Sequence, residues 1–193
     1  MLEIDILEGA RGTGKSSLAF RLRQTTPETT LINFTGFHND GEQGLEKVKK
    51  YYSNWMHFLF KMYNHDSKLL FDRFYFSEEV YSALYKEYNF TEEYKRLNEL
   101  LEDLSEFGVK INIFFLTIKN KDELKERLIR DKVPFGKAEE SVSETLNQQH
   151  AYSLLFDSLE INYKNENLSV HWIDTTGKTG DEVYAEVLQL KAT

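Results

Sequence analysis

The chain has 193 residues, of which 40% are hydrophobic and 29% are charged. This length suits one domain of roughly 100–200 residues that buries its own core. The lack of cysteine in the sequence excludes disulfides and thiolate metal sites. The net charge of −8 argues against a protein that coats long duplex nucleic acid, because neutralising phosphates requires clustered Lys and Arg. The net charge is still compatible with a small local basic site.

The sequence carries no pattern typical of secreted or membrane proteins. Residues 1–5 hold neither a basic segment nor the start of a long apolar core, so we expect no signal peptide. No apolar run approaches the roughly 20 residues of a membrane span. Pro27 and Pro134 are the only prolines, and no repeat or linker-like stretch divides the chain. We therefore expect residues 1–193 to form a single domain of a cytoplasmic protein that does not contact a membrane.

Segments typical of strands and helices alternate along the chain. In order, the expected elements are a strand at 2–8, a helix at 15–24, a turn at 27–30, a strand at 31–34, a loop at 37–44, a helix at 45–64, a strand at 68–71 ending at Asp72, helices at 77–88 and 91–107, a strand at 111–118, a helix at 121–131, a loop at 134–136, a helix at 139–163, a strand at 170–173 and a helix at 180–190. Gly108 is expected to follow the end of one helix and Asn120 to cap the next. This alternation predicts an α/β fold with right-handed crossovers and a parallel sheet covered on both faces.

A phosphate-binding loop is the clearest motif. The stretch from Gly9 to Ser16 fits G-x-x-x-x-G-K-[ST] at every defined position, between an expected strand and an expected helix. Backbone N–H groups of such a loop surround a phosphate, and the helix N-terminus adds partial positive charge. Lys15 can reach the β- and γ-phosphates, and the Ser16 hydroxyl can ligate Mg²⁺. The residues predicted to contact ATP here are Gly9, Ala10, Arg11, Gly12, Thr13, Gly14, Lys15, Ser16 and Ser17. Many unrelated activities share this loop.

An acidic–basic pair follows the third expected strand. Asp72 stands at the carboxyl end of that strand, the edge of a parallel sheet where ligands collect. It could ligate Mg²⁺ or accept a proton from an attacking hydroxyl. Arg73 could make a two-pronged contact with a phosphate or order the acceptor. A surface ion pair at the end of a strand is the alternative interpretation.

The stretch from Asp72 to Tyr81 resembles a signature of thymidylate kinases, Asp-Arg-aromatic-x-x-Ser-x-x-small-Tyr. Glu8-Gly9 before the loop is similar to the first motif of that family, and deoxynucleoside kinases share the fold. The resemblance implies a three-layer P-loop kinase fold with a five-stranded parallel sheet, helices on both faces and a short lid at about 127–139. It also implies that Ser77 and Tyr81 line the acceptor pocket, with Asp72 and Arg73 between ATP-Mg²⁺ and the acceptor. Thymidylate kinases are commonly dimers, so a homodimer stays open.

The acceptor half departs from that family. After the second strand the family usually has Phe-Arg-Glu-Pro-Gly-Gly, whose Arg grips the monophosphate of the acceptor, whereas this chain has Asn-Phe-Thr-Gly-Phe-His at 33–38. Neither that Arg nor the catalytic Glu of deoxynucleoside kinases is present, and Asp40 is the nearest carboxylate. Trp55 replaces an Arg that reads thymine. Phe34 and Trp55 are assigned to the acceptor pocket, where Trp55 could stack on a base or be plain core. These departures favour an acceptor with a neutral hydroxyl group, or an acceptor that is held differently from the monophosphate of the thymidylate kinases.

Two arginines lie on one face of the helix expected at 121–131. Arg127 and Arg130 are three residues apart. In the kinases that this chain resembles, a lid helix supplies arginines to the transferring phosphoryl group, where added positive charge has a large effect. A solvated basic turn at a helix C-terminus is the alternative. Arg11 could act in the same way, and Thr176 lies in a loop that in this group often runs beside the adenine. The five histidines show no metal-ligand spacing.

Taken together, the motifs predict an ATP- and Mg²⁺-dependent kinase. Lys15, Asp72, Arg73, Arg127 and Arg130 are its expected catalytic residues, and Ser16 and Asp72 its metal ligands. The acceptor could be a deoxynucleotide, a nucleoside, or a hydroxyl on a modified base, with DNA only as a local substrate. A nucleotide-dependent switch that has lost its chemistry is the alternative from another class.

Overall fold

The sheet has five parallel strands. The computed structural model describes residues 1–34, 39–131, 138–163 and 165–192, without the side chains of 138–140. The strands are β1 (Glu3–Glu8), β2 (Thr29–Asn33), β3 (Lys68–Asp72), β4 (Lys110–Thr117) and β5 (Leu168–Asp174). Their order across the sheet is β2-β3-β1-β4-β5, and every neighbouring pair is parallel. The predicted five-stranded parallel sheet is confirmed.

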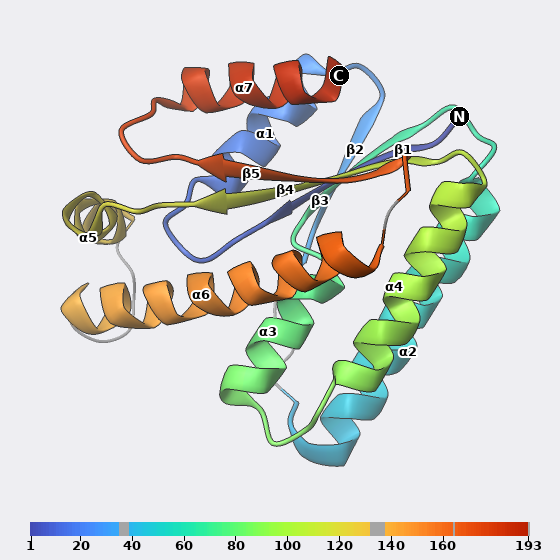
Figure 1. Cartoon of the computed structure of the whole chain (residues 1–193), viewed down its shortest axis with the longest axis horizontal. Coiled ribbons are helices and arrows are strands. Elements are labelled where there is room, and N and C mark those ends of the chain that lie inside the picture. The colour runs from blue at the N-terminus through green and yellow to red at the C-terminus, as the bar shows by residue number, and fades with distance from the viewer. Residues whose placement is uncertain (35–38, 132–137, 164, 193) are drawn as a thin grey trace.

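Helices cover both faces of this sheet (Figure 1). The helices are α1 (Lys15–Thr25), α2 (Gly41–Met62), α3 (Tyr75–Tyr85), α4 (Thr91–Glu106), α5 (Lys121–Arg130), α6 (Ala138–Asn162) and α7 (Gly180–Ala192). One face carries α1 and α7, and the opposite face carries α2, α3, α4 and α6. The short helix α5 lies beyond the carboxyl ends of β4 and β5. This arrangement confirms the three-layer α/β fold.

Strand β4, next to the central strand β1, is buried between the helical layers. In β4 the side chains from Ile111 to Leu116 are fully buried except for a trace at Asn112, because each face of the strand lies under helices. Each fully buried apolar side chain contributes about 1.5–3 kcal/mol relative to an exposed one. Aromatic rings add directional packing on the α2 and α3 side, where Phe71 stacks on Phe74 with centroids 4.6 Å apart. The core therefore fixes the carboxyl edge of the sheet, from which the loops emerge.

Several expected boundaries were wrong. Helix α3 begins two residues before and ends three residues before the helix expected at 77–88. Helix α2 begins at Gly41, so residues 41–44 of the expected loop are helical, while residues 37 and 38 lie outside the described part. The cause is Asp40, whose carboxylate accepts the Gly41 N–H at 2.8 Å as a helix cap. Strand β2 begins at Thr29, two residues inside the expected turn. The expectations for Asn120, which caps α5 through two backbone N–H groups, and for Gly108, with φ of 86° after α4, are confirmed.

Within the described ranges, no helix combines the length and apolar character needed to cross a bilayer. The same part of the chain holds no group of three or more His, Asp or Glu side chains arranged to bind a metal ion.

Candidate active site

The loop between β1 and α1 is shaped by close backbone contacts. Gly9 adopts φ of 139°, and a Cβ at this position would lie 2.3 Å from the backbone oxygen of Leu116, so no larger residue fits. The Thr13 hydroxyl donates to the Ala10 oxygen at 2.9 Å, and the Lys15 ammonium donates to that same oxygen at 2.7 Å. Burial, reinforced by the charge of Arg73, lowers the pKa of Lys15 well below its usual range. The loop therefore folds around a buried ammonium group.

Ser16 and Asp72 meet at the edge of the sheet. The Ser16 hydroxyl donates to Asp72 Oδ2 at 2.8 Å, and the Asn33 amide lies 3.4 Å from the same oxygen. The other carboxylate oxygen, Asp72 Oδ1, is buried and has no hydrogen-bond partner among the described residues. A buried polar atom normally finds a partner, so this oxygen is suited to a ligand. Hydroxyl and carboxylate oxygens are the ligands that Mg²⁺ prefers, and the two residues fit such an ion together with phosphate oxygens and water.

Arg73 is held in an uncommon conformation beside this pair. Its φ of 72° lies in the left-handed region, which costs a non-glycine residue roughly 1–2 kcal/mol. Its guanidinium Nη1 donates to the hydroxyls of Tyr81 and Tyr152, each at 3.1 Å, and lies 3.4 Å from Ser77 Oγ. The guanidinium also lies 5.3 Å from the centre of the Tyr81 ring. The structure therefore brings Ser77 and Tyr81 to Arg73, as the sequence suggested, and adds Tyr152 from α6.

Helix α5 packs directly over the phosphate loop. A Cβ at Gly12 would lie 3.0 Å from the Leu124 side chain, which shows how closely the helix approaches. Arg127 donates to the Gly12 oxygen at 3.3 Å, to the Thr175 oxygen at 2.8 Å and to Glu123 at 2.5 Å. Its side chain is only 13% exposed. Arg127 thus ties the phosphate loop to the loop after β5.

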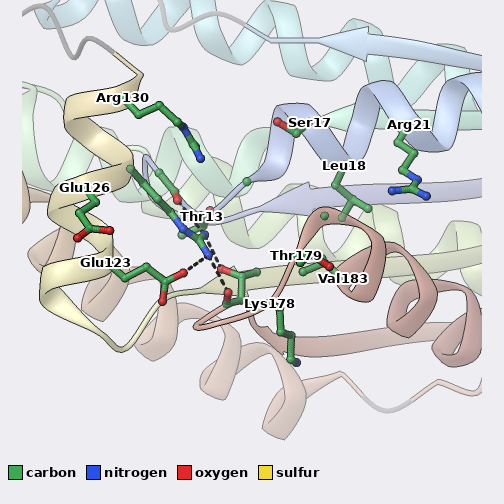
Figure 2. A pocket seen from close by; sticks show the side chains of 15 residues that line it. Thr13, Ser17, Leu18, Arg21, Glu123, Glu126, Arg130, Lys178, Thr179 and Val183 are labelled. Atoms are coloured by element: carbon green, nitrogen blue, oxygen red, sulfur yellow. Dashed lines mark hydrogen bonds and ion pairs between the residues drawn. The ribbon is translucent and has the colours of Figure 1, made fainter.

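Arg130 has a different environment, one turn further along α5. Its side chain is 72% exposed and pairs with Asp131 at 2.9 Å. Figure 2 shows its guanidinium directed toward the phosphate loop and the cavity beside it. Arg127 is thus fixed between backbone groups, whereas Arg130 can turn toward a bound molecule.

A cavity of about 670 Å³ adjoins the phosphate loop. Its walls come from the loop itself, from α1, from α5 and from the start of α7 (Figure 2). Ser17, Arg127, Arg130 and Thr175 are among the lining residues. This volume lies in the range of about 300–1,000 Å³ that is common for small-molecule and cofactor sites. The cavity is therefore large enough for a nucleoside whose phosphates extend into the loop.

Arg11 and Thr176 are not among the residues that line this cavity. The Thr176 hydroxyl accepts the Lys119 N–H at 2.8 Å and donates to Asp174, while the neighbouring Thr175 lines the cavity. Arg11 is exposed on the phosphate loop. Residues 35–38 of the altered acceptor stretch and residues 132–137 of the expected lid lie outside the described part.

Phe34 and Trp55 form part of an aromatic cluster beside β3. The Trp55 ring lies 5.6 Å from the rings of both Phe34 and Phe71. Phe34 is also 5.5 Å from Phe74, directly after Arg73. The outer side of Trp55 lines a separate hollow of about 350 Å³ with three other residues of α2. In the described part, these two side chains therefore approach the site through Phe74.

The sequence did not point to Tyr152, and in the loop after the last strand it singled out Thr176 although Thr175 lines the cavity. Tyr152 reaches Arg73 from a helix that begins more than sixty positions later in the chain, and no local motif marks it. The one available hint is its spacing of four residues from Gln148, which places both side chains on one face of α6. Gln148 accepts the Tyr81 hydroxyl at 3.3 Å and so belongs to the same cluster.

The chain is similar in structure to several solved kinases. Thymidylate kinase from Candida albicans matches with a TM-score of 0.63 at 15% identity, over 98% of this chain and 90% of that one. Polyphosphate kinase 2 from Arthrobacter aurescens TC1 matches with a TM-score of 0.61 at 17% identity, over 99% of this chain and 67% of that one. Deoxyadenosine kinase from M. mycoides matches with a TM-score of 0.53 at 12% identity, over 98% of each chain.

No protein-family model matches this chain, and no curated protein does so either. The structural matches alone define its class: the chain has the fold of the P-loop kinases. The expectation drawn from the phosphate loop and the Asp72–Arg73 motif is confirmed at this level. At such low identity the matches establish the fold, and the acceptor has to be argued from the site.

Proposed function

We propose that this protein is an ATP- and Mg²⁺-dependent phosphotransferase that moves the γ-phosphoryl group to a nucleotide, a nucleoside or a related hydroxyl compound. The observation that carries the proposal is the Ser16–Asp72 pair, in which one buried carboxylate oxygen has no partner among the described residues. This pair stands next to the buried ammonium of Lys15 on a loop that also walls the cavity. Such a set of groups suits a Mg²⁺-bound triphosphate better than any neutral ligand.

On the donor side, each group has a distinct task. The loop N–H groups and Lys15 bind the β- and γ-phosphates, and the nucleoside occupies the cavity between α1, α5 and α7. Ser16 and Asp72 would hold Mg²⁺, which would neutralise negative charge on the phosphate groups. Asp72 is also the best-placed base for an attacking hydroxyl, although phosphoryl transfer depends more on positioning than on proton removal.

On the acceptor side, hydroxyl groups surround the guanidinium of Arg73. Arg73 presents its guanidinium among the hydroxyl groups of Ser77, Tyr81 and Tyr152. A hydroxyl-bearing molecule that exchanges hydrogen bonds with these groups fits the cluster well. This supports a neutral acceptor such as a nucleoside over a phosphorylated one, and a homodimer is not required for any of these contacts.

A panel of acceptors incubated with γ-labelled ATP and Mg²⁺ tests this proposal. The panel holds thymidine, the other deoxynucleosides, their monophosphates, and DNA containing a hydroxymethylated base. We expect label on a free nucleoside. Label on monophosphates alone would replace the neutral acceptor with a nucleotide, and label on DNA alone would favour a modified base that enters the site as a flipped nucleotide. Tight ATP binding with no labelled acceptor would favour the nucleotide-dependent switch instead.

Arg127→Ala is expected to weaken ATP binding by about 10-fold or more. The substitution removes hydrogen bonds between a charged donor and the backbone of both loops that frame the cavity, each worth about 1.5–3 kcal/mol when the donor is charged. Titration calorimetry with a non-hydrolysable ATP analogue measures the dissociation constant. An affinity equal to that of the unmodified protein would contradict the role of Arg127 in shaping the donor site.

Arg130→Ala, one helical turn further along α5, is expected to lower kcat rather than the affinity for ATP. Because Arg130 is exposed and pairs only with Asp131 among the described residues, its loss leaves the affinity for the analogue within about two-fold. If it turns toward the transferring phosphoryl group, kcat falls by about 100-fold or more. An unchanged kcat in this variant would contradict a role for Arg130 at the transferring phosphoryl group.

A further inference from the structure

Glu8 is a fully buried carboxylate that no step of the proposed transfer uses directly. It is the last residue of β1 and has 0% exposure. Its Oε1 accepts the backbone N–H of Phe74 at 2.7 Å, and its Oε2 accepts the Ser77 hydroxyl at 2.6 Å. Both donors lie at the start of α3, directly after Arg73. Glu8 therefore binds the strained turn that carries Asp72 and Arg73.

The hydrogen bonds around Glu8 form a chain with a defined direction. An ionised carboxylate only accepts hydrogen bonds, so the Ser77 hydroxyl must donate to Glu8. The Ser77 oxygen then accepts the Tyr152 hydroxyl, 2.6 Å away. The Tyr152 oxygen in turn accepts Arg73 Nη1 at 3.1 Å. The hydroxyl hydrogens of Tyr152 and Ser77 each have one acceptor along this chain, and the chain ends at Glu8.

We infer that Glu8 is a positioning residue for phosphoryl transfer, which fixes the Arg73 guanidinium through Ser77 and Tyr152 and fixes the Asp72–Arg73 turn through Phe74. This inference rests on the proposed function. Glu8 itself does not reach the reacting atoms, because it is covered by the groups that it binds. Hydrogen-bonded networks in a site of low polarity are stronger than in water, and they are costly when one member is mismatched.

The charge of Glu8 determines which groups donate and which accept along this series of hydrogen bonds. Burial raises the pKa of Glu8 to about 7, although the Ser77 hydrogen bond and the charge of Arg73 oppose the shift. A proton on Glu8 would add a hydrogen to a chain in which every hydroxyl hydrogen already has its acceptor. One donor would then lose its partner, or Tyr152 and Arg73 would face each other as two donors. The other ionisable side chains whose charge acts on Glu8 or that feel its charge are Lys15, Tyr52, Tyr75, Tyr94 and Tyr152.

Transfer is therefore expected to require ionised Glu8, and Glu8→Gln tests this. The unmodified protein should show kcat that rises with pH through about 7. Glutamine has nearly the same shape but places an N–H₂ group against either Phe74 or Ser77, so it imitates the protonated state at every pH. We expect kcat to fall by about 10–100-fold above pH 7.5, since a displacement of about 1 Å in a positioned group can cost 100-fold. The KM for ATP should stay within about two-fold, and the rise near pH 7 should vanish.

Asp5→Asn is the matched control on the same strand. Asp5 is also buried with a raised pKa, caused by burial, but it binds Asn112 and Lys191 toward the opposite end of β1. This variant should lose thermal stability while keeping the kcat and the pH profile of the unmodified protein. A purely structural role for Glu8 would make the two variants alike.

Tyr152→Phe provides a second route if Glu8→Gln does not fold. It removes one hydroxyl from the chain without changing any charge, and we expect about a tenfold lower kcat with an unchanged KM for ATP. A folded Glu8→Gln with the kcat and pH profile of the unmodified protein would overturn the inference, as would a fully active Tyr152→Phe. No transfer to any acceptor by the unmodified protein would instead contradict the proposed function itself.

Discussion

Lys15→Ala is expected to lower the rate of phosphoryl transfer by about 1,000-fold or more. The ammonium is buried on the loop proposed to bind the triphosphate, where its charge would act on negative charge spread over the transferring group. The same substitution should not destabilise the fold. Burial lowers the pKa of Lys15, so the protein holds this cation at a cost in the absence of phosphate, and alanine removes that cost.

The two effects of Lys15→Ala are measured separately. Steady-state transfer to the labelled acceptor gives kcat, and differential scanning calorimetry gives the midpoint of unfolding, which should be equal to or above that of the unmodified protein. Lys178→Ala serves as a control, because Lys178 also lines the cavity but pairs with Glu186 at 2.7 Å, away from the loop. Normal turnover in a folded Lys15→Ala variant would contradict the assignment of the donor site.

Asp72→Asn is expected to raise the Mg²⁺ concentration needed for half-maximal activity by about 10-fold or more and to lower kcat by about 100-fold. Asparagine keeps the shape and still accepts the Ser16 hydroxyl through its oxygen. It replaces one oxygen with a nitrogen that cannot bind a cation, and it removes the negative charge that a hard divalent ion prefers. The substitution therefore tests the binding of Mg²⁺ while the packing around residue 72 stays the same.

A titration of activity with MgCl₂ at saturating ATP checks this second prediction. Asp174→Asn is its matched control, because Asp174 also stands at the carboxyl end of a parallel strand yet is occupied by Thr176 and Lys119. Its Mg²⁺ dependence should equal that of the unmodified protein. An Asp72→Asn variant with an unaltered Mg²⁺ requirement would show that the ion is held by other groups.

Local patterns in the sequence were sufficient for most of the fold. Strand β4 was predictable because both its faces are buried, which leaves a nearly continuous apolar run from Ile111. The start of α2 was not, because Gly41 and Gly44 resemble a loop. In the structure Gly44 has a packing reason, since a Cβ there would lie 2.7 Å from the Asn39 oxygen. The Asp40 cap then compensates for two weak helix formers.

In the candidate site, too, the sequence predicts the residues that local motifs place and misses those that depend on packing between helices. Lys15, Ser16 and Asp72 lie in motifs whose spacing is set by one strand and the turn after it, so a short stretch of sequence is enough to place them. Tyr152 and the Glu8 chain depend on how α6 packs against α3, and no spacing within a single element encodes that contact. The sequence drew attention to Glu8 through a family resemblance, but its task becomes visible only from the four-residue hydrogen-bond chain.

The surroundings of Arg73 support the interpretation that the acceptor is a neutral hydroxyl compound. The sequence lacks the Arg that would grip a monophosphate, and the structure surrounds the remaining Arg73 with hydroxyls that already occupy Nη1. A dianionic acceptor would have to compete with these contacts, whereas a neutral hydroxyl compound can join them. This contrast is the reason for placing free nucleosides first in the acceptor panel.

Phosphoryl transfer is tested most directly by comparing α-labelled with γ-labelled ATP as donor, with and without Mg²⁺, in the presence of the acceptor panel. We predict that label reaches the acceptor only from the γ position and only with Mg²⁺, because the proposed function assigns Lys15, Ser16 and Asp72 to the terminal phosphates and Mg²⁺. Tight, Mg²⁺-dependent ATP binding without any labelled acceptor would contradict the account.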